Sequence, residues 1–223
     1  KGVGISTESY GFANISNLIL QQGNISNTDG WGIYFKNSNN NTINNVTITT
    51  DSPDNGYGIY FLQSNSSSVT NSIINTLGRD DGYGIYLKDF SHSTTLDNNT
   101  INTNGSDSNG IRIDRSNNNI LTNNNMNTTR ANSILIYGDS STHYVQTIDT
   151  TNLAEGFPIN YTYNEDNKIL DGEDLTGFGQ YIIADSRGVT INNCQFAHDS
   201  LNLFSVNDSI IDNNTINTGE GLG

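Results

Sequence analysis

Apolar residues recur along this chain in short alternating runs rather than in helical patterns. The clearest run is Gly-Ile-Tyr-Phe at residues 32–35, which returns at 58–61 and, as Gly-Ile-Tyr-Leu, at 84–87. Gly110-Ile111-Arg112-Ile113 follows, so successive glycines are 26 residues apart, and a looser copy stands at 133–136. Alternation with a period of two over so few residues is typical of a short strand.

A second apolar pattern lies between these runs and reads apolar, polar, Asn, two residues of any kind, apolar. Its copies begin at Ile15, Ile43, Val69, Leu96, Leu121, Ile191 and Ile211. Two short strands in each unit cannot form a helix bundle or a doubly wound sheet. The repeat therefore predicts an all-β solenoid, a parallel β-helix of about nine coils in which each unit forms one coil.

Asparagine is the residue that the second pattern places most regularly. Asn tolerates the left-handed backbone of a tight corner, and its side-chain amide both donates and accepts hydrogen bonds. Stacked copies can therefore bond to one another from coil to coil. We expect an inward-facing ladder made of Asn17, Asn45, Asn71, Asn98, Asn123, Asn193 and Asn213.

The regularity of the repeat predicts one β-helix domain over residues 1–223. Regular coils are expected over residues 1–140 and 181–223, and coils with longer corner loops over residues 141–180. The chain opens within a coil and shows no amphipathic capping helix at either end, whereas β-helices need caps. We therefore expect a segment of a longer exported protein, with the leader outside this sequence.

Composition narrows the classes of function. The chain is 33% hydrophobic and 14% charged, against about 45–50% and about 25% in an ordinary domain, and 38 of its 223 residues are Asn. Such polarity favours disorder unless the few apolar residues are organised, as the repeat organises them here. No apolar stretch is long enough to span a membrane, and one cysteine excludes an internal disulfide. Nine basic against 23 acidic residues argue against nucleic-acid binding.

The Asn-Asn-x-Ile units resemble the repeats of right-handed parallel β-helix proteins of the pectate-lyase-like superfamily. The run from Pro158 to Tyr163, together with residues 169–172 and 189–194, resembles NosD-like repeat proteins, which are common in surface proteins of archaea and some bacteria. The resemblance covers nearly the whole chain and implies a right-handed β-helix. It is weak for function, because the same coil serves lyases, hydrolases, epimerases, phage tailspikes and adhesins.

Two columns of aromatic residues flank the Gly-Ile-Tyr runs. Strand alternation points one column outward, so we expect an exposed aromatic ladder there. Exposed rings pack on the apolar faces of sugars, so this face is a candidate site for polysaccharide; the alternative is stacking that only stabilises neighbouring strands. The candidate ligand-binding residues are Trp31, Tyr34, Tyr57, Tyr60, Tyr83 and Tyr86.

Acidic residues gather in the corners that precede the same runs. Like charges about 5 Å apart repel by roughly 0.8 kcal/mol even in bulk water, so neighbouring carboxylates favour a cation, and their oxygens suit Ca²⁺. Calcium is therefore the candidate metal ion, and the chain requires no other cofactor. The alternative is a solvated acidic edge that deters aggregation. The candidate ligands are Asp29, Asp54, Asp80 and Asp81, with a second acidic group at Glu165, Asp166, Asp171, Glu173 and Asp174.

These patterns favour a non-catalytic structural or adhesive module of an extracellular surface protein. Its expected partners are copies of itself or other surface proteins, in a layer or filament, and polysaccharide; no nucleic acid is expected. One alternative is a polysaccharide lyase or glycoside hydrolase of the same superfamily, with Asp80, Asp81 and Arg79 as the catalytic group. A phage tailspike segment is the third reading.

Two further motifs bear on these readings without settling them. Asn27-Thr28-Asp29-Gly30 is similar to a polygalacturonase signature, but neighbouring coils repeat it, and that family's Gly-His-Gly and Arg-x-Lys elements are missing. Eleven Asn-x-Ser/Thr sites are candidates for glycosylation, although composition alone predicts about eight. They include Asn24, Asn65, Asn104 and Asn160.

Overall fold

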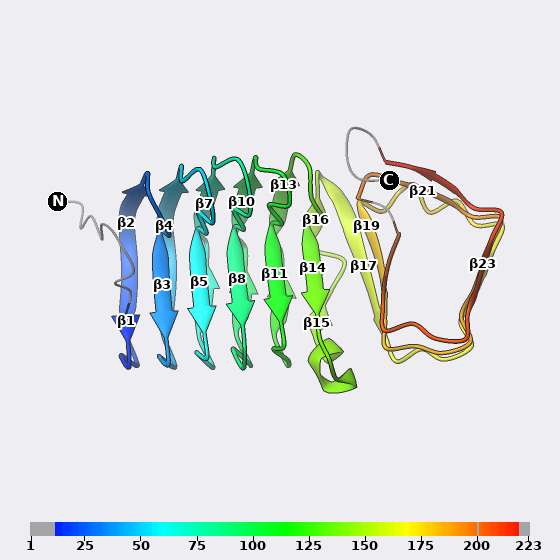
Figure 1. Cartoon of the computed structure of the whole chain (residues 1–223), viewed down its shortest axis with the longest axis horizontal. Coiled ribbons are helices and arrows are strands. Elements are labelled where there is room, and N and C mark those ends of the chain that lie inside the picture. Colours follow the sequence, from blue (N-terminus) through cyan, green and yellow to red (C-terminus); the bar gives the residue numbers. More distant parts are fainter. Residues whose placement is uncertain (1–11, 200, 219–223) are drawn as a thin grey trace.

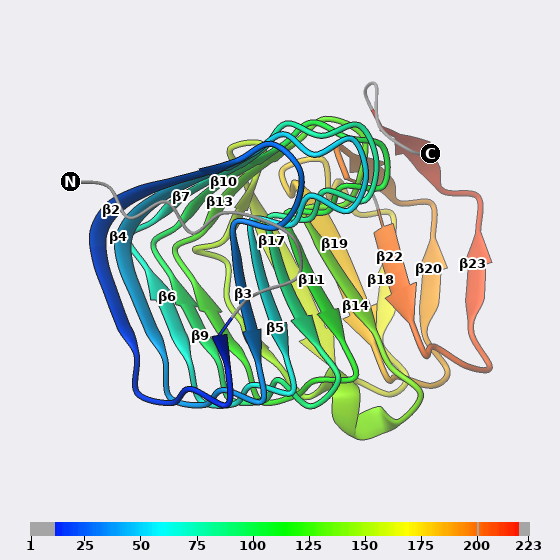
Figure 2. The same cartoon turned by 60° about the vertical axis from the view of Figure 1, so that its left-hand side comes forward.

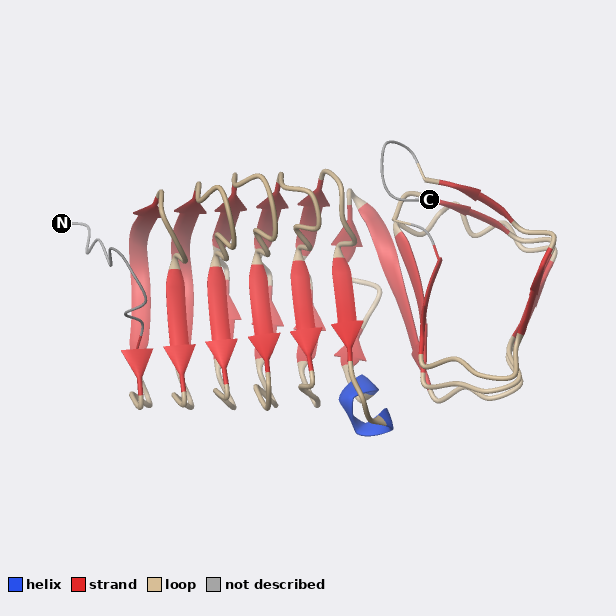
Figure 3. Cartoon of the chain, viewed as in Figure 1, coloured by secondary structure: helices blue, strands red, loops and turns tan. Residues whose placement is uncertain are grey.

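The computed structural model describes residues 12–199 and 201–218 of the chain. Within these residues it holds 24 β-strands and one 3₁₀ helix, η1 (Ser141–Tyr144), so the predicted all-β solenoid is confirmed (Figure 3). The strands form two stacks. Figure 1 shows the first stack from the side, with its strands standing next to one another, and the second nearly end on, with its coils nested.

One wall of the first stack is a six-stranded parallel sheet. Its strands, in spatial order, are β1 (Phe12–Ala13), β3 (Ile33–Lys36), β5 (Ile59–Leu62), β8 (Ile85–Lys88), β11 (Ile111–Asp114) and β14 (Ile134–Tyr137). The Gly-Ile-Tyr runs form β3, β5 and β8 in perfect register, with Ile33 beside Ile59 and Ile59 beside Ile85. All three isoleucines are at most 1% exposed, so the predicted inward alternation is confirmed.

The other walls of the first stack come from the second apolar pattern. Their strands are β2 (Ile19–Asn27), β4 (Thr42–Thr50), β6 (Ser68–Thr70), β7 (Ile73–Thr76), β9 (Thr95–Asp97), β10 (Thr100–Thr103), β12 (Ile120–Thr122), β13 (Asn125–Thr128), β15 (Thr147–Ile148) and β16 (Leu153–Ala154). Ile43 lies beside Val69 and Ile48 beside Ile74, and all four are fully buried. Figure 2 shows the loops that join β4 to β5, β7 to β8 and β10 to β11 lying one over another.

A tight hairpin ends the first stack. β16 pairs antiparallel with β17 (Phe157–Tyr163) across Glu155 and Gly156, whose φ angles are 52° and 86°. A two-residue hairpin loop with positive φ at both positions matches the twist of the strands it joins. The hairpin reverses the direction of the chain, and the second stack begins at Phe157.

The second stack has three short walls. Its strands are β17, β18 (Ile169–Asp171), β19 (Gln180–Ala184), β20 (Thr190–Asn192), β21 (Gln195–Ala197), β22 (Leu201–Phe204), β23 (Ile210–Asp212) and β24 (Thr215–Asn217). They pair in parallel as β17-β19-β22, β18-β20-β23 and β21-β24. Leu170, Ile191 and Ile211 share one column; the second pattern predicts this alignment for Ile191 and Ile211 but does not include Leu170.

The prediction of nine coils in a single run is wrong in the number of coils and in their arrangement. Five complete turns separate β1 from β14 and two separate β17 from β22, so the solenoid makes about seven turns. The expected irregular segment at residues 141–180 also divides differently. Its first part, up to Ala154, contains η1, β15 and β16 of the first stack, and from Phe157 onward it belongs to the second. The sequence pattern missed this division because both stacks use the same apolar units.

The two stacks share strand β19. All five of its residues are buried, which a strand achieves only when both of its faces are covered. Ile182 and Ala184 belong to the core of the first stack, whereas Tyr181 and Ile183 belong to the core of the second. The wall that contains β19 therefore closes the end of the first stack.

Side chains of the second stack also bind the backbone of β14, the last strand of the six-stranded sheet. The Ile134 N–H donates to Gln180 Oε1 at 2.9 Å, and Gln180 Nε2 donates to the Ile134 carbonyl at 2.7 Å. The Ser133 N–H donates to a carboxylate oxygen of Asp199 at 2.7 Å. Unpaired edge strands invite association with other chains, so these bonds protect the edge of the first stack without a capping helix.

The predicted asparagine ladder has the expected backbone conformation, but its side chains do not face the interior. All seven predicted residues have positive φ, from 52° at Asn71 to 61° at Asn17, as a tight corner requires. Their side chains are exposed, however, and not inward. They stack on the surface: Asn98 donates to Asn71 at 2.8 Å, and Asn213 donates to Asn193 at 2.6 Å.

The buried ladder lies one residue further along the chain. Asn99 Nδ2 donates to Asn124 Oδ1 at 2.9 Å, and Asn124 Nδ2 donates to Asn152 Oδ1 at 2.9 Å. Each amide also donates to a backbone carbonyl of the preceding coil, as Asn124 does to Leu96 at 2.8 Å. The corner residue turns the backbone, and its successor faces the interior.

Candidate functional site

The aromatic columns on the outside of the six-stranded sheet cover each other. Tyr34, Tyr60 and Tyr86 point away from the core as predicted, but Tyr60 is 7% exposed and Tyr86 only 4%. Trp31, Tyr57 and Tyr83 fold back over them from the preceding loop. The expected exposed ladder is therefore wrong: the six rings form a second apolar cluster outside the coil wall.

The arrangement of these rings leaves little aromatic face for a ligand. Within the outer column the Tyr57 and Tyr83 rings are stacked in parallel but offset, with centroids 5.0 Å apart and planes at 4°. Between the columns the contacts are edge to face, as between Tyr83 and Tyr86 at 5.2 Å and 78°. Both geometries are favourable for aromatic pairs. Burial raises the pKa of the Tyr57 hydroxyl to about 12, and it also raises the pKa values of Tyr60, Tyr83 and Tyr86.

The acidic corners lie in register, as the alignment of the repeat predicts. Asp80 forms backbone bridges with Asp54 on one side and Ser106 on the other, and the Ser106 hydroxyl donates to the Asp80 carboxylate. Arg79 and Asp29 are exposed. Across residues 12–199 and 201–218, no three His, Cys, Asp or Glu side chains are placed to hold a metal ion. The geometry therefore gives no support to a calcium site at Asp29, Asp54, Asp80 and Asp81, or at the second acidic group.

The inner aromatic column ends at Arg112, which occupies the position of the tyrosines in β11. Its guanidinium carbon lies 4.8 Å from the Tyr83 ring centroid and 5.5 Å from that of Tyr86. The Arg112 Nε lies 3.0 Å from an Asp114 carboxylate oxygen, and the Tyr86 hydroxyl donates to Asp114 at 2.6 Å. Burial opposes the charge of Arg112, yet the bond to Asp114 outweighs it and raises the pKa of the guanidinium.

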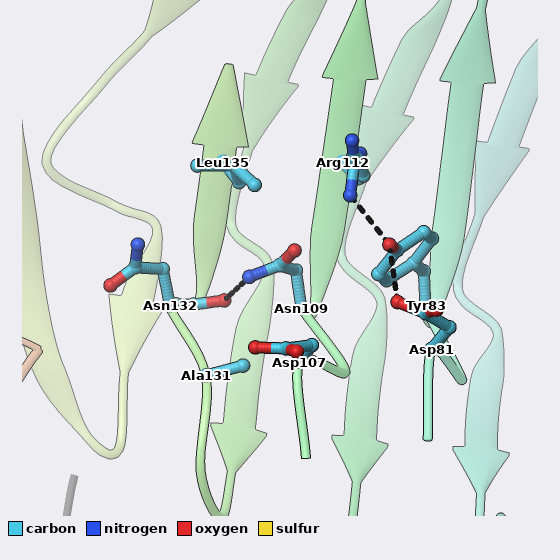
Figure 4. Close-up of a pocket in the computed structure, with 8 residues that line it drawn as sticks. All are labelled: Asp81, Tyr83, Asp107, Asn109, Arg112, Ala131, Asn132 and Leu135. Carbon is cyan, nitrogen blue, oxygen red and sulfur yellow. Dashed lines mark hydrogen bonds between the residues drawn. The ribbon is translucent and has the colours of Figure 1, made fainter. Parts of the chain in front are cut away.

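A pocket of about 220 Å³ opens where the aromatic columns end. It is lined by Asp81, Tyr83, Asp107, Asn109, Arg112, Ala131, Asn132 and Leu135 (Figure 4). These residues come from the loops before β8, β11 and β14 and from strands β11 and β14. Asn109 and Asn132 continue the outer column of Trp31, Tyr57 and Tyr83, so the last two coils carry small amides where the first three carry large rings.

Loop length explains why the hollow forms at this turn. Eight residues separate β4 from β5 (51–58) and β7 from β8 (77–84), seven separate β10 from β11 (104–110), and five separate β13 from β14 (129–133). The last loop is too short to cover the one before it. The side chains of the 104–110 loop therefore border an open space instead of another stacked corner.

Several polar groups of the pocket are already bonded to one another. The Tyr83 hydroxyl donates to Asp81 Oδ1 at 2.8 Å and accepts a hydrogen bond from Arg112 Nη1. The Asn109 amide nitrogen donates to the Asn132 carbonyl at 3.2 Å (Figure 4). The Asp107 carboxylate and the Asn132 side-chain amide have no partner among the described residues. The Asp107 carboxylate is therefore available to a ligand.

The pocket gathers only two of the predicted site residues. Asp81 and Tyr83 line it, whereas Trp31, Tyr34, Tyr57, Tyr60 and Tyr86 lie in the aromatic cluster, and Arg79, Asp29, Asp54 and Asp80 lie outside the lining. Prediction missed Arg112, Asp107, Asn109 and Asn132 as a site. Two departures from the repeat could have revealed it: Arg replaces Tyr in the fourth Gly-Ile-Tyr run, and the step from Gly110 to Ser133 is 23 residues instead of 26.

The named glycosylation candidates lie at the surface to different extents. Asn24 and Asn104 are exposed, and Asn65 and Asn160 are half-buried. The Asn65 side-chain oxygen accepts a hydrogen bond from the His92 backbone at 2.8 Å, which ties it to the next coil. Asn24 and Asn104 are therefore the more accessible of the four.

Comparison with known proteins identifies the family. The pattern described as "right handed beta helix region" matches residues 2–170, about three quarters of the chain. No curated protein and no solved structure matches the chain. Among the described residues, none forms a helix with the length and apolar character needed to cross a membrane. The stacked parallel strands agree with the family match, and the chain belongs to the right-handed β-helix family.

Proposed function

We propose that this chain is a non-catalytic structural module of an extracellular surface protein. The observation that carries the proposal is the shared strand β19, which is buried on both faces and joins the two cores into one body. Two cores joined through one buried strand suit a rigid spacer that holds a face at a fixed distance. The acidic composition, with a net charge of −14, favours a highly solvated exterior.

The placement of the ionisable side chains also supports a structural role. Asp81 bonds to Tyr83, Asp114 bonds to Arg112 and Tyr86, and Asp80 accepts from Ser106. Arg115 pairs with Asp89 of the preceding coil at 2.5 Å. The bonds of Asp114 to Tyr86, of Ser106 to Asp80 and of Arg115 to Asp89 join neighbouring coils, whereas those of Asp81 to Tyr83 and of Arg112 to Asp114 lie within one coil. Each of these ionisable groups has a partner within the fold, which is typical of a stabilising role.

Incubation with acidic and neutral polysaccharides tests the non-catalytic part. Polygalacturonate, alginate and xylan are incubated with the purified protein, with and without calcium. Absorbance of unsaturated products and release of reducing ends are then followed. We expect neither signal to rise above that of heat-denatured protein. Turnover by the wild type that Asp81→Ala or Asp80→Ala abolishes would establish the lyase or hydrolase alternative instead.

Surface labelling tests the extracellular part. Antibodies raised against residues 12–218 should label intact source cells, and external protease should remove that label without lysis. Labelling that requires permeabilised cells would contradict the proposal.

The partner that we propose is a second copy or a neighbouring surface protein. The support is the outer face of the β18-β20-β23 wall, where Ile169 is 70% and Ile210 60% exposed. Sedimentation velocity over a hundredfold concentration range tests self-association. Growth of the sedimentation coefficient with concentration is expected, and Ile169→Lys should suppress it. A constant monomer value would exclude the second copy as partner.

A further inference from the structure

The pocket beside Arg112 lies where the five-residue loop 129–133 follows the longer loops of the preceding coils. Elsewhere on this flank each ring or acidic corner has a counterpart in the next coil. Here the short 129–133 loop leaves the Asp107 carboxylate without a partner beside Asn109, and the Asn132 backbone carbonyl is turned toward Asn109 (Figure 4). A polar group left unpaired in a concave site is what a ligand site requires.

The walls of the pocket combine apolar and polar surface. Leu135 supplies most of the aliphatic surface, and Arg112 lies over the largely buried Tyr83 ring. The volume of about 220 Å³ lies below the roughly 300–1,000 Å³ of sites for drug-sized ligands. The space therefore suits one small ring bearing several hydroxyl groups rather than an extended chain of rings.

The charge of the residues that line the pocket indicates which kind of sugar ring it would bind. Asp81 and Asp107 line the pocket, while the charge of Arg112 is balanced by its ion pair with Asp114. The local balance is negative, and the Asp107 carboxylate is exposed and unpaired. An anionic sugar would meet repulsion, whereas an ammonium group would be attracted.

The geometry points to a binding site for a single pyranose sugar without negative charge, with an amino sugar preferred. Asp107 would accept from the ammonium group, the Asn109 side-chain oxygen would accept from a hydroxyl group, and Leu135 would contact the apolar edge of the ring. This inference goes beyond the proposed structural function, which stands or fails independently of it.

Three matched sugars test the inference on the intact chain. Glucosamine, glucose and glucuronate share one ring and carry charges of +1, 0 and −1 at neutral pH. Each is titrated into ¹⁵N-labelled protein, and the side-chain amide signal of Asn109 is followed by NMR. We expect this signal to shift and the affinity to fall in the order given, by about fivefold per unit charge.

Two variants and one small cation distinguish binding in this pocket from nonspecific attraction of cations to the acidic protein. Asp107→Asn should reduce glucosamine affinity about fivefold and leave glucose unchanged, whereas Asp54→Asn, an exposed carboxylate outside the pocket, should change neither. Methylammonium should not reproduce the glucosamine shifts. Absence of shifts with glucosamine and glucose at 50 mM, equal shifts with methylammonium, or tightest binding of glucuronate would each overturn the inference.

Discussion

The side-chain amide of Gln180 pairs with the backbone of Ile134 as a neighbouring strand would. It accepts from the Ile134 N–H at 2.9 Å and donates to the Ile134 carbonyl at 2.7 Å, and Gln180 is fully buried. A parallel β-helix ends in a strand whose backbone groups have no next coil to bond. Here one glutamine from the second stack supplies those bonds, and the wall that carries it covers the open core.

Removal of this amide should destabilise the whole chain. Gln180→Ala leaves a buried N–H and a buried carbonyl without partners, and each unsatisfied group costs about 1–3 kcal/mol. We expect a loss of about 2–4 kcal/mol in the free energy of unfolding, measured by urea denaturation. Gln195→Ala is the matched control, because Gln195 is exposed in a strand of the same stack, and it should cost under about 0.5 kcal/mol. Equal effects of the two variants would contradict the role assigned to Gln180.

Asp199 makes the contact between the stacks sensitive to pH. Burial raises the pKa of its carboxyl to about 6, helped by the charge of Glu155 and opposed by the bond from Ser133. The folded state therefore holds this proton more tightly than the unfolded state. Its contribution to stability is fully present below about pH 4 and is lost as the pH rises through 6, by up to about 3 kcal/mol.

Asp199→Asn should abolish that change. The amide oxygen that this substitution introduces still accepts from the Ser133 N–H but carries no charge. We expect the stability of the variant relative to wild type to increase by about 2–3 kcal/mol between pH 4 and pH 7, as followed by urea denaturation at each pH. Asp54→Asn serves as the exposed control and should give a flat difference. A flat difference for Asp199→Asn as well would refute the assignment.

The two asparagines of one corner should respond differently to substitution. Asn124 is fully buried and bonds to Asn99, Asn152 and the Leu96 carbonyl, so Asn124→Ala should cost about 2–3 kcal/mol. Asn123 is exposed with a φ of 54°, which glycine adopts readily, so Asn123→Gly should change stability by less than about 0.5 kcal/mol. Thermal unfolding of both variants checks this. A larger loss for Asn123→Gly would place the structural ladder on the surface instead.

The column of glycines before the Gly-Ile-Tyr strands is expected to tolerate no side chain. A Cβ on Gly84 would meet Ile101 Cγ2 and lie 2.6 Å from the Gly110 carbonyl oxygen, both in the packed interior. Gly84→Ala should cost about 2–3 kcal/mol, whereas Gly177→Ala, with nothing within 4 Å, should be nearly neutral. Denaturant midpoints of the two variants provide the comparison. Similar midpoints would show that adjacent coils lie further apart than described.

Periodicity predicted the parts of the fold that repeat. The register of Ile33, Ile59 and Ile85, and the left-handed corners such as Asn71, follow from spacing alone because every coil must place the same residue at the same bend. The spacing did not predict which asparagine side chains point into the core. A left-handed corner residue points outward, and only the side-chain bonds of Asn99 and Asn124 show which amide enters the core.

The repeat pattern could not predict features that occur only once in the chain. The hairpin at Gly156 and the contact of Gln180 with Ile134 join segments through a reversal of direction that no periodic pattern encodes. The pocket shows the same limit. The repeat predicted Tyr83 and Asp81 as candidate site residues because they belong to columns of similar residues. Arg112 marks the pocket for the opposite reason, since it replaces the tyrosine that the column would place there.

Hydrogen exchange at β14 tests the central claim that the second stack closes the first. The amides of Ser133 and Ile134 bond only to Asp199 and Gln180 in the described structure, whereas the Ile85 amide bonds within the sheet, to the Gly110 carbonyl. Native-state exchange of the full chain, read by NMR, should show Ser133 and Ile134 protected to within about tenfold of Ile85. Exchange of Ser133 and Ile134 at the rate of an open edge strand, with Ile85 still protected, would contradict the account.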